Sequence, residues 1–240
     1  MKLGILAASV LLLMGLAAPA TAENPEHLKQ LLRTNECVGC DLSNAQLAGL
    51  NLQGANLKDA NLQGANLNQT NLNEANLNRV NLSQATLQQT TLVGAKLHGA
   101  NLEAADLRYA NLSLAGMVIS NLKDANLSYA NLVGANLESA ELHGANLYYA
   151  HQSVASLHHV SFGGEMYPLD VVGINLRDAN LTEANLKGAN LMGSDLADAK
   201  LDNAELADAN LQGANLVNVD LDSTSLQGAI LPTGKIAVTY

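Results

Sequence analysis

The chain has 240 residues, 22 acidic and 12 basic side chains, a formal net charge of −10 and only 3% aromatic residues. A globular core of this size normally draws on several large aromatic side chains, because each buries a large area. The interior must therefore be built from Leu and Ala. The excess of acid leaves no basic stripe for phosphates, which argues against nucleic-acid binding.

The first 22 residues are typical of a secretory signal peptide. Lys2 is followed by an apolar run over 3–16 and a small-residue triplet at 20–22, the order of regions found in such signals. We predict cleavage between Ala22 and Glu23. An uncleaved anchor is the alternative, but the apolar run is short for a membrane span. The expected product is exported to the periplasm, a thylakoid lumen or the outside, without stable membrane insertion.

Residues 23–40 are predicted to contain a capping helix. Asn24 suits the N-cap and Pro25 the first helical position. Three leucines of this segment fall on one helical face, which we expect to cover the open end of the structure that follows: Leu28, Leu31 and Leu32.

Cys37 and Cys40 form the sharpest local motif. Behind a secretory signal a pair of thiols most often becomes oxidised, and we predict a structural disulfide that pins the capping helix to the first repeat. Free thiols and a redox or metal site are the alternatives. A redox role expects a βαβ context that is missing here, and a zinc site needs two more ligands, of which His27 would supply one.

From residue 41 the chain repeats every five residues. Leu, or Met at Met117, stands at position 42 and every fifth position to 147, and the residue two before it is nearly always Ala. A helix would rotate each Leu about 140° from the last and leave no apolar stripe. In an extended segment Ala and Leu share one side. Each pentad is therefore predicted to be a minimal strand and a corner, in a chain that coils so that its turns pair.

Three tyrosines indicate how many pentads make one turn. Tyr109, Tyr129 and Tyr149 recur at intervals of 20 residues, or four pentads. In a four-sided coil they would stand in one column, with a spacing of about 4.8 Å. Such a column is a candidate recognition stripe for protein or sugar. Packing between turns that only stabilises the face is an equal alternative.

The repeat forms two blocks in different phases. The first block, 41–162, loses its pattern after residue 150, and the second block covers 174–231. The stretch 163–173 fits neither phase and is predicted to be an irregular loop. Three histidines gather where the pattern fails, and we interpret them as surface residues because their spacing without a carboxylate does not suit a metal: His151, His158 and His159.

These pentads, such as the Ala-Asn-Leu-Lys-Asp sequence at 55–59, resemble the pentapeptide-repeat family, whose A-(D/N)-L-x-x unit folds as a right-handed, four-sided parallel β-helix. The resemblance covers about 41–162 and 174–231. It implies an all-β solenoid in which Leu and the preceding Ala face the axis, while Asn and the last two residues face outward. It also implies that some members act as acidic DNA mimics toward type II topoisomerases.

Acidic residues concentrate in the second block. On a four-sided coil Asp178 would stack with Asp198, and Asp202 with Asp222, which places like charges one above the other at a cost. The cost hints at a binding surface, for calcium or sugar, or at a contribution to solubility alone.

The chain contains no nucleophile elbow, P-loop or HExxH motif, and we predict no catalysis, no cofactor and no bound metal. The predicted function is an exported, non-enzymatic scaffold with an unidentified protein partner. An acidic DNA mimic that inhibits or protects a type II topoisomerase is the alternative. The tail, 232–240, is expected to close the last turn or to pair with a second subunit in a homodimer.

Overall fold

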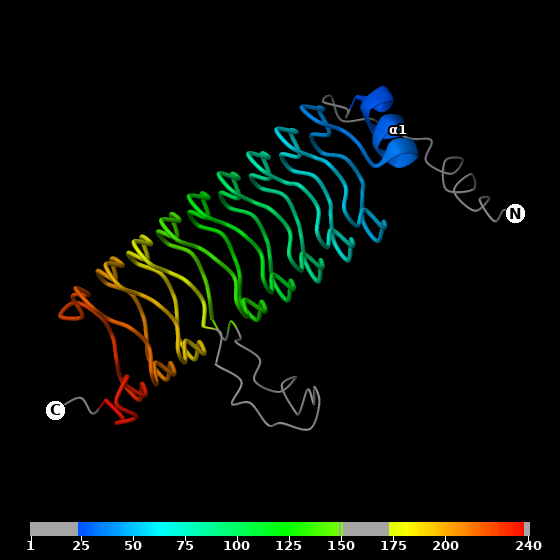
Figure 1. Ribbon diagram of the computed structural model, residues 1–240. Coiled ribbons are helices and arrows are strands. Elements are labelled where there is room, and N and C mark those ends of the chain that lie inside the picture. Colours follow the sequence, from blue (N-terminus) through cyan, green and yellow to red (C-terminus); the bar gives the residue numbers. More distant parts are fainter. Residues whose placement is uncertain (1–23, 149, 151–172, 238–240) are drawn as a thin grey trace, which may run out of the picture.

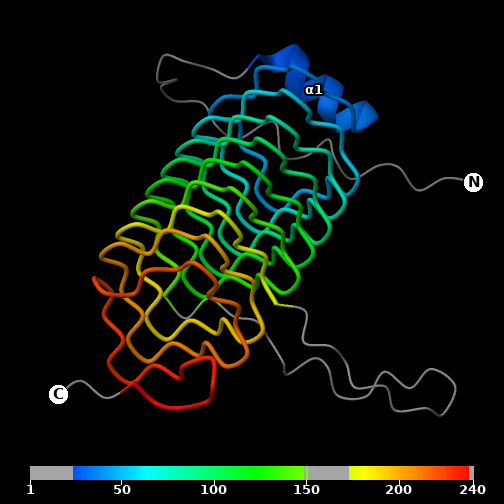
Figure 2. The same cartoon turned by 60° about the vertical axis from the view of Figure 1, so that its left-hand side comes forward.

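The computed structural model describes residues 24–148, 150 and 173–237. These residues form one short helix, α1 (Pro25–Thr34), and a long coil of isolated β-bridges. In Figure 1 the coil is a rod with α1 across its N-terminal end, and Figure 2 shows the four sides of its turns. The fold is a right-handed, four-sided parallel β-helix, as predicted.

Pairing between residues 20 apart sets the size of each turn. Asn56 forms a parallel bridge with Asn76, and Asn61 with Asn81. Alongside these bridges the Leu57 N–H donates to the Asn76 carbonyl at 2.8 Å. One turn therefore takes four pentads, which agrees with the tyrosine spacing.

The interior of the coil is filled by the repeated Leu and Ala side chains. Leu57, Ala60 and Leu62 are fully buried, and burial of each Leu stabilises the fold by roughly 1.5–3 kcal/mol. Where Thr70 replaces Ala, its hydroxyl donates to the Leu47 carbonyl at 2.8 Å. Thr90 likewise donates to the Leu67 carbonyl at 2.7 Å, so both of these buried hydroxyls are hydrogen-bonded.

The outward Asn of a pentad has two hydrogen-bonding roles. The Asn61 side-chain oxygen accepts the Gln63 N–H at 3.2 Å, and the Asn81 amide donates to the Asn61 oxygen at 3.0 Å. Asp can fill only the first role, because a carboxylate has no donor. Asp41 stands in the first Asn-ladder position of its side, where it accepts from Ser43 and needs no earlier partner.

The phase change between the two blocks does not interrupt the coil. Asn136 bridges Asn175, which is 39 residues ahead instead of 20. The chain that follows Ala150 thus contains 19 residues more than a regular turn, which explains the phase slip. The second block stacks directly on the first. The weakened repeats at 151–162, and the predicted loop up to residue 172, lie outside the described residues.

Helix α1 covers the N-terminal end much as predicted. The Asn24 side chain accepts the Glu26 N–H at 3.0 Å, as an N-cap does. Leu31 is buried and Leu28 packs against the core, but Leu32 is 53% exposed. The expectation that all three leucines face the coil was therefore wrong for Leu32, because Leu32 lies about 100° around the helix from the buried Leu31 and so stands at the edge of the covered face.

The described part of the tail folds back on the last turn. Ile236 forms an antiparallel bridge with Ile230, and the Leu231 N–H donates to the Lys235 carbonyl at 2.7 Å. These bonds pair part of an edge that would otherwise be open. The tail thus fills the first of its two predicted roles.

Candidate functional site

The disulfide lies inside the first turn of the coil. Cys37 and Cys40 occupy the positions of Leu and Ala in later pentads, are buried, and form a disulfide with Cα atoms 5.3 Å apart. Glu36 bridges Asn56, so the coil begins one pentad before residue 41. The bond joins the two sides of one corner. The prediction that it pins the helix to the first repeat was wrong, because both cysteines belong to the coil.

His27 is one of the residues that make polar contacts between α1 and the coil, and Gln30 is another, because its side-chain amide donates to the Glu36 carbonyl at 3.0 Å. The His27 ring Nδ1 accepts the Asp41 N–H at 3.0 Å, and the His27 carbonyl oxygen lies 3.3 Å from the Cys37 sulfur. The ring is therefore engaged in the cap. Among the described residues, no group of three His, Cys, Asp or Glu side chains is arranged to hold a metal ion.

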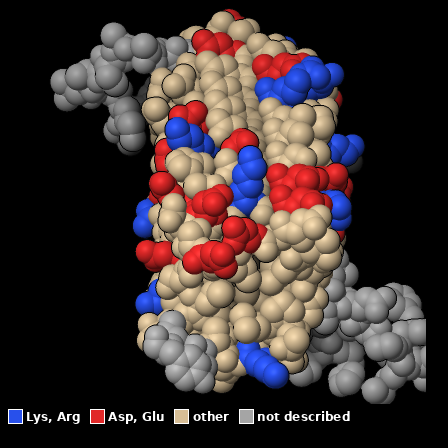
Figure 3. All heavy atoms as spheres, turned by 90° about the vertical axis from the view of Figure 1, so that its left-hand side faces the viewer, with Lys and Arg blue, Asp and Glu red and all other residues tan. Residues whose placement is uncertain are grey.

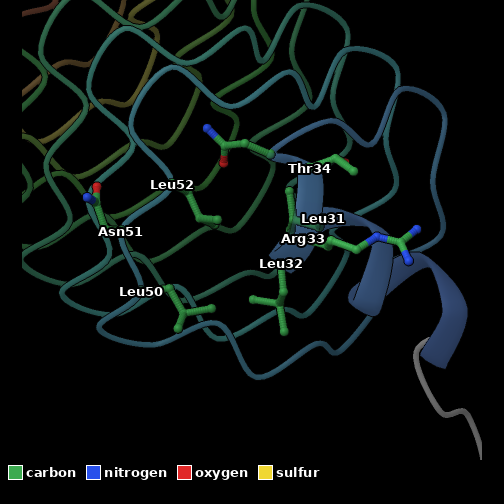
Figure 4. Close-up of a pocket in the computed structure, with 8 residues that line it drawn as sticks. Leu31, Leu32, Arg33, Thr34, Leu50, Asn51 and Leu52 are labelled. Carbon is green, nitrogen blue, oxygen red and sulfur yellow. The ribbon is translucent and has the colours of Figure 1, made fainter. Parts of the chain in front are cut away.

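A groove of about 300 Å³ lies between the end of α1 and the first turn of the coil. Its apolar lining includes Leu32 and Leu50, and Leu50 stands where most pentads have Ala. Figure 4 shows Leu32 and Leu50 beside the same space, while the Arg33 side chain extends away from it. The groove offers apolar contact and no acid–base pair.

The tyrosine column is confirmed for its first two members. The rings of Tyr109 and Tyr129 are stacked, with centroids 5.0 Å apart and planes 6° from parallel. The third predicted member, Tyr149, lies outside the described residues. Tyr148, which was not assigned to the column, meets Tyr129 edge-on at 5.8 Å. Because the stacked rings turn their faces toward each other, the column supports packing between turns more than sugar stacking.

The predicted acidic stack contains a cation. The Arg177 guanidinium lies 2.9 Å from the Asp198 carboxylate and 3.9 Å from that of Asp178. Asp195, on the same side, is 3.8 Å away. Asn218 also donates to Asp198 at 2.8 Å. The like-charge cost expected from the sequence is therefore reduced by a neighbour of the opposite sign.

The second acidic pair, Asp202 and Asp222, is exposed at neighbouring corners. The Asn203 N–H donates to the Ser223 hydroxyl at 3.0 Å, which holds these corners together. Within the described part of the chain, neither aspartate has an ion pair. Figure 3 shows acidic side chains gathered in patches with Lys and Arg side chains beside them.

Leu114 and Ile119 are two of the exposed apolar side chains that were not predicted from the sequence. Leu114 is 61% exposed and Ile119 is 55% exposed, and both have a positive φ, of 59° and 52°. This conformation is strained for a bulky residue, and most of all for a β-branched one. A large apolar residue in the last position of a pentad, where Gly and polar residues are common, is the signal that marks them.

Several predicted residues fall outside the described residues. These are the cleavage pair Ala22 and Glu23 and the histidines His151, His158 and His159. Among the residues that are described, no helix is both long and apolar enough to cross a membrane.

Comparison with known proteins gives matches along most of the chain. A family model described as pentapeptide repeat region matches residues 38–112. A second model, described as pentapeptide repeats (8 copies), matches 120–151, 170–198 and 199–232. No curated protein matches the chain.

Solved structures that the chain resembles are pentapeptide repeat proteins. HetL, from the cyanobacterium Nostoc sp. strain PCC 7120 and involved in heterocyst differentiation regulation, is 31% identical; the alignment covers 90% of this chain and 100% of HetL, with a TM-score of 0.41. A protein from the Arabidopsis thaliana thylakoid lumen is 22% identical over 66% of this chain and 70% of its own, with a TM-score of 0.29. QnrB1, a plasmid-mediated fluoroquinolone resistance protein, is 16% identical over 82% of this chain and 92% of its own, with a TM-score of 0.36.

Proposed function

The chain belongs to the pentapeptide-repeat family, and on this premise we propose that it is an exported, non-enzymatic scaffold that binds a partner protein. The observation that carries the proposal is the filled interior of the coil. Leu and Ala side chains fill the interior of the coil from Leu42 to Leu211 along the described turns. The outer faces and the ends of the coil are therefore the surfaces on which a partner would bind.

Export is supported by two features at the N-terminal end. The leader has the regions of a secretory signal, and Cys37 and Cys40 form a buried disulfide at the start of the coil. Disulfides persist in oxidising compartments and are rare in the cytosol.

The test is the intact mass of the protein from fractionated native cells, with thiols alkylated before or after reduction. A chain beginning at Glu23, in an exported fraction, with both cysteines blocked only after reduction, is the expected result. An uncleaved chain in the cytoplasm with free thiols would contradict export.

The alternative of an acidic DNA mimic rests on the net charge of −10. Arg177 lies among three aspartates, so this acidic patch lacks the unbroken negative charge of a phosphate backbone. An excess of the mature protein is expected to leave DNA supercoiling by a type II topoisomerase unchanged. Inhibition or protection of the enzyme would favour the mimic.

Calcium or sugar binding has less support from the same surfaces. Arg177 competes with a cation at the predicted acidic column, and the Tyr109 and Tyr129 rings cover each other. Calorimetric titration of the protein with calcium chloride or with neutral oligosaccharides is expected to show no binding heat.

A further inference from the structure

One side of the coil carries almost no charge. This side, called here the neutral face, contains a single charged residue, Glu74, in its eight described pentads, whereas the side that begins at Asp41 contains ten charged residues. The pentads of the neutral face begin at Asn51, Asn71, Thr91, Asn111, Asn131, Asn190, Asn210 and Ile230.

Leu114 projects from the edge of the neutral face between two glycines. Gly94 and Gly134 hold the equivalent position in the turns before and after it. A Cβ atom on Gly94 would meet only the Glu74 side chain, at 3.9 Å, so the space above Gly94 is open. Val93, half-buried, lies next to this space. The edge thus presents an exposed apolar side chain and, one turn away, a gap next to Val93 and the aliphatic stem of Glu74.

Leu114 differs from its equivalents in its side chain and not in its backbone. Its φ of 59° is the usual corner conformation of this coil, as at Tyr109 (60°) and Asp124 (56°), and Gly or a polar residue is common there. Leu114 thus exposes an apolar side chain at a position where the coil rarely has one. Tyr109, 55% exposed, stands at the opposite edge of the same face and widens the apolar area.

We propose that the neutral face binds a second copy of this chain. The chain has a net charge of −10, and like charges that meet across an interface oppose association. The neutral face is the side on which two copies meet with the fewest charges opposed. A two-fold axis between neighbouring turns brings Leu114 of each copy over Gly94 of the other, as an isologous contact requires.

Gly94 is the position that receives Leu114 because a Cβ atom there would meet no atom nearer than 3.9 Å. The two rods are antiparallel and lie side by side, unlike an end-to-end dimer through the tail.

Sedimentation velocity of the chain from Glu23 to Tyr240 over a range of concentrations tests the proposal. A reversible dimer is expected, and Leu114→Asn is expected to raise its dissociation constant about ten-fold or more, because the apolar contact is lost. Asn suits a positive φ, so this variant keeps its fold, and an unchanged far-ultraviolet circular dichroism spectrum checks that.

Two matched variants locate the interface. Ile119→Asn makes the same change at an exposed residue of positive φ on another side of the coil, and Ile236→Asn alters the exposed tail. Both are expected to leave the dimer intact. A monomer at every concentration, a dimer insensitive to Leu114→Asn, or a dimer lost equally in either control would overturn the proposal. Export is independent of this result.

Discussion

The side chain of Asp124 occupies the space that a Cβ atom on Gly144 would need, one turn further along the coil. Gly144 also has a φ of +66°. Two separate restrictions, one conformational and one steric, therefore act on the same residue. Gly54 has the same φ of +66° but no neighbour within 4 Å of such a Cβ. A substitution at Gly54 therefore measures the conformational restriction without the steric one.

Gly54→Ala is expected to lower the free energy of unfolding by about 1 kcal/mol, because Ala is disfavoured at positive φ. Gly144→Ala is expected to lower it by about 1 kcal/mol more, because the Asp124 side chain must also move. Urea unfolding of the two variants measures the difference. If Asp124→Ala combined with Gly144→Ala does not recover that extra loss, the steric explanation is wrong.

Reduction of the disulfide is expected to destabilise the protein by about 2 kcal/mol, the chain-entropy value for closing a four-residue loop. Thermal unfolding with and without a phosphine reductant measures the shift. The Cys37→Ala/Cys40→Ala variant is the control and should not respond to reductant. An equal midpoint for oxidised and reduced wild-type protein would contradict the prediction.

Asp106 is expected to make the stability depend on acid pH. Burial raises the pKa of this carboxyl, but hydrogen bonds from Arg108 and Gln88 outweigh burial and hold the pKa below its ordinary value. A folded-state pKa below the unfolded one contributes stability above the unfolded pKa of about 3.9, and this contribution is lost as the pH falls toward the folded value.

Asp106→Asn tests this dependence, because Asn is the usual residue at its position in the pentad. The variant is expected to be less stable than wild type by about 1 kcal/mol at neutral pH. The gap should narrow as the pH falls below the unfolded pKa of about 3.9 and toward the lower folded value. Urea midpoints at several pH values give the comparison, and a gap that stays constant with pH would count against the carboxylate.

Arg177→Gln is expected to lower the free energy of unfolding by about 1 kcal/mol at low salt, because three aspartates lose their shared cation. Screening should return most of this loss at about 1 M sodium chloride. Lys187→Gln, which removes a cation without an ion pair among the described residues, is the control. An equal loss in both variants would show that Arg177 acts only through net charge.

Much of the fold could be predicted from the sequence, because a short repeat defines where each side chain stands. The five-residue period places Leu57 and Ala60 inside, and the interval between Tyr109 and Tyr129 gives four pentads per turn. Periodicity also predicts that Asp178 and Asp198 lie on neighbouring turns.

The parts that were not predicted depend on side-chain direction and on the ends of the coil. The repeat does not predict which residue stands at the variable position of Arg177. Its ion pair with Asp198 depends on the rotamer of the Arg177 side chain. Leu32 fits the apolar face of the helix by spacing, but it stands at the edge of that face and is 53% exposed. The exposure of Leu114 could have been predicted, because it is a large apolar residue in a pentad position where Gly and polar residues are common.

Because bridges join residues 20 apart, each pentad advances the chain by about a quarter of a turn around the coil axis. Removal of a whole turn would shorten the rod and leave each remaining side aligned, so that the neutral face stays continuous. Removal of one pentad would rotate everything beyond it by about a quarter turn and would bring charged corners under uncharged ones. The extra residues that follow Ala150 do not disturb the alignment of the sides, because beyond them Asn185 still pairs with Asn146 on the same side of the coil. Insertions and deletions in this protein are therefore constrained by rotation more strictly than by length.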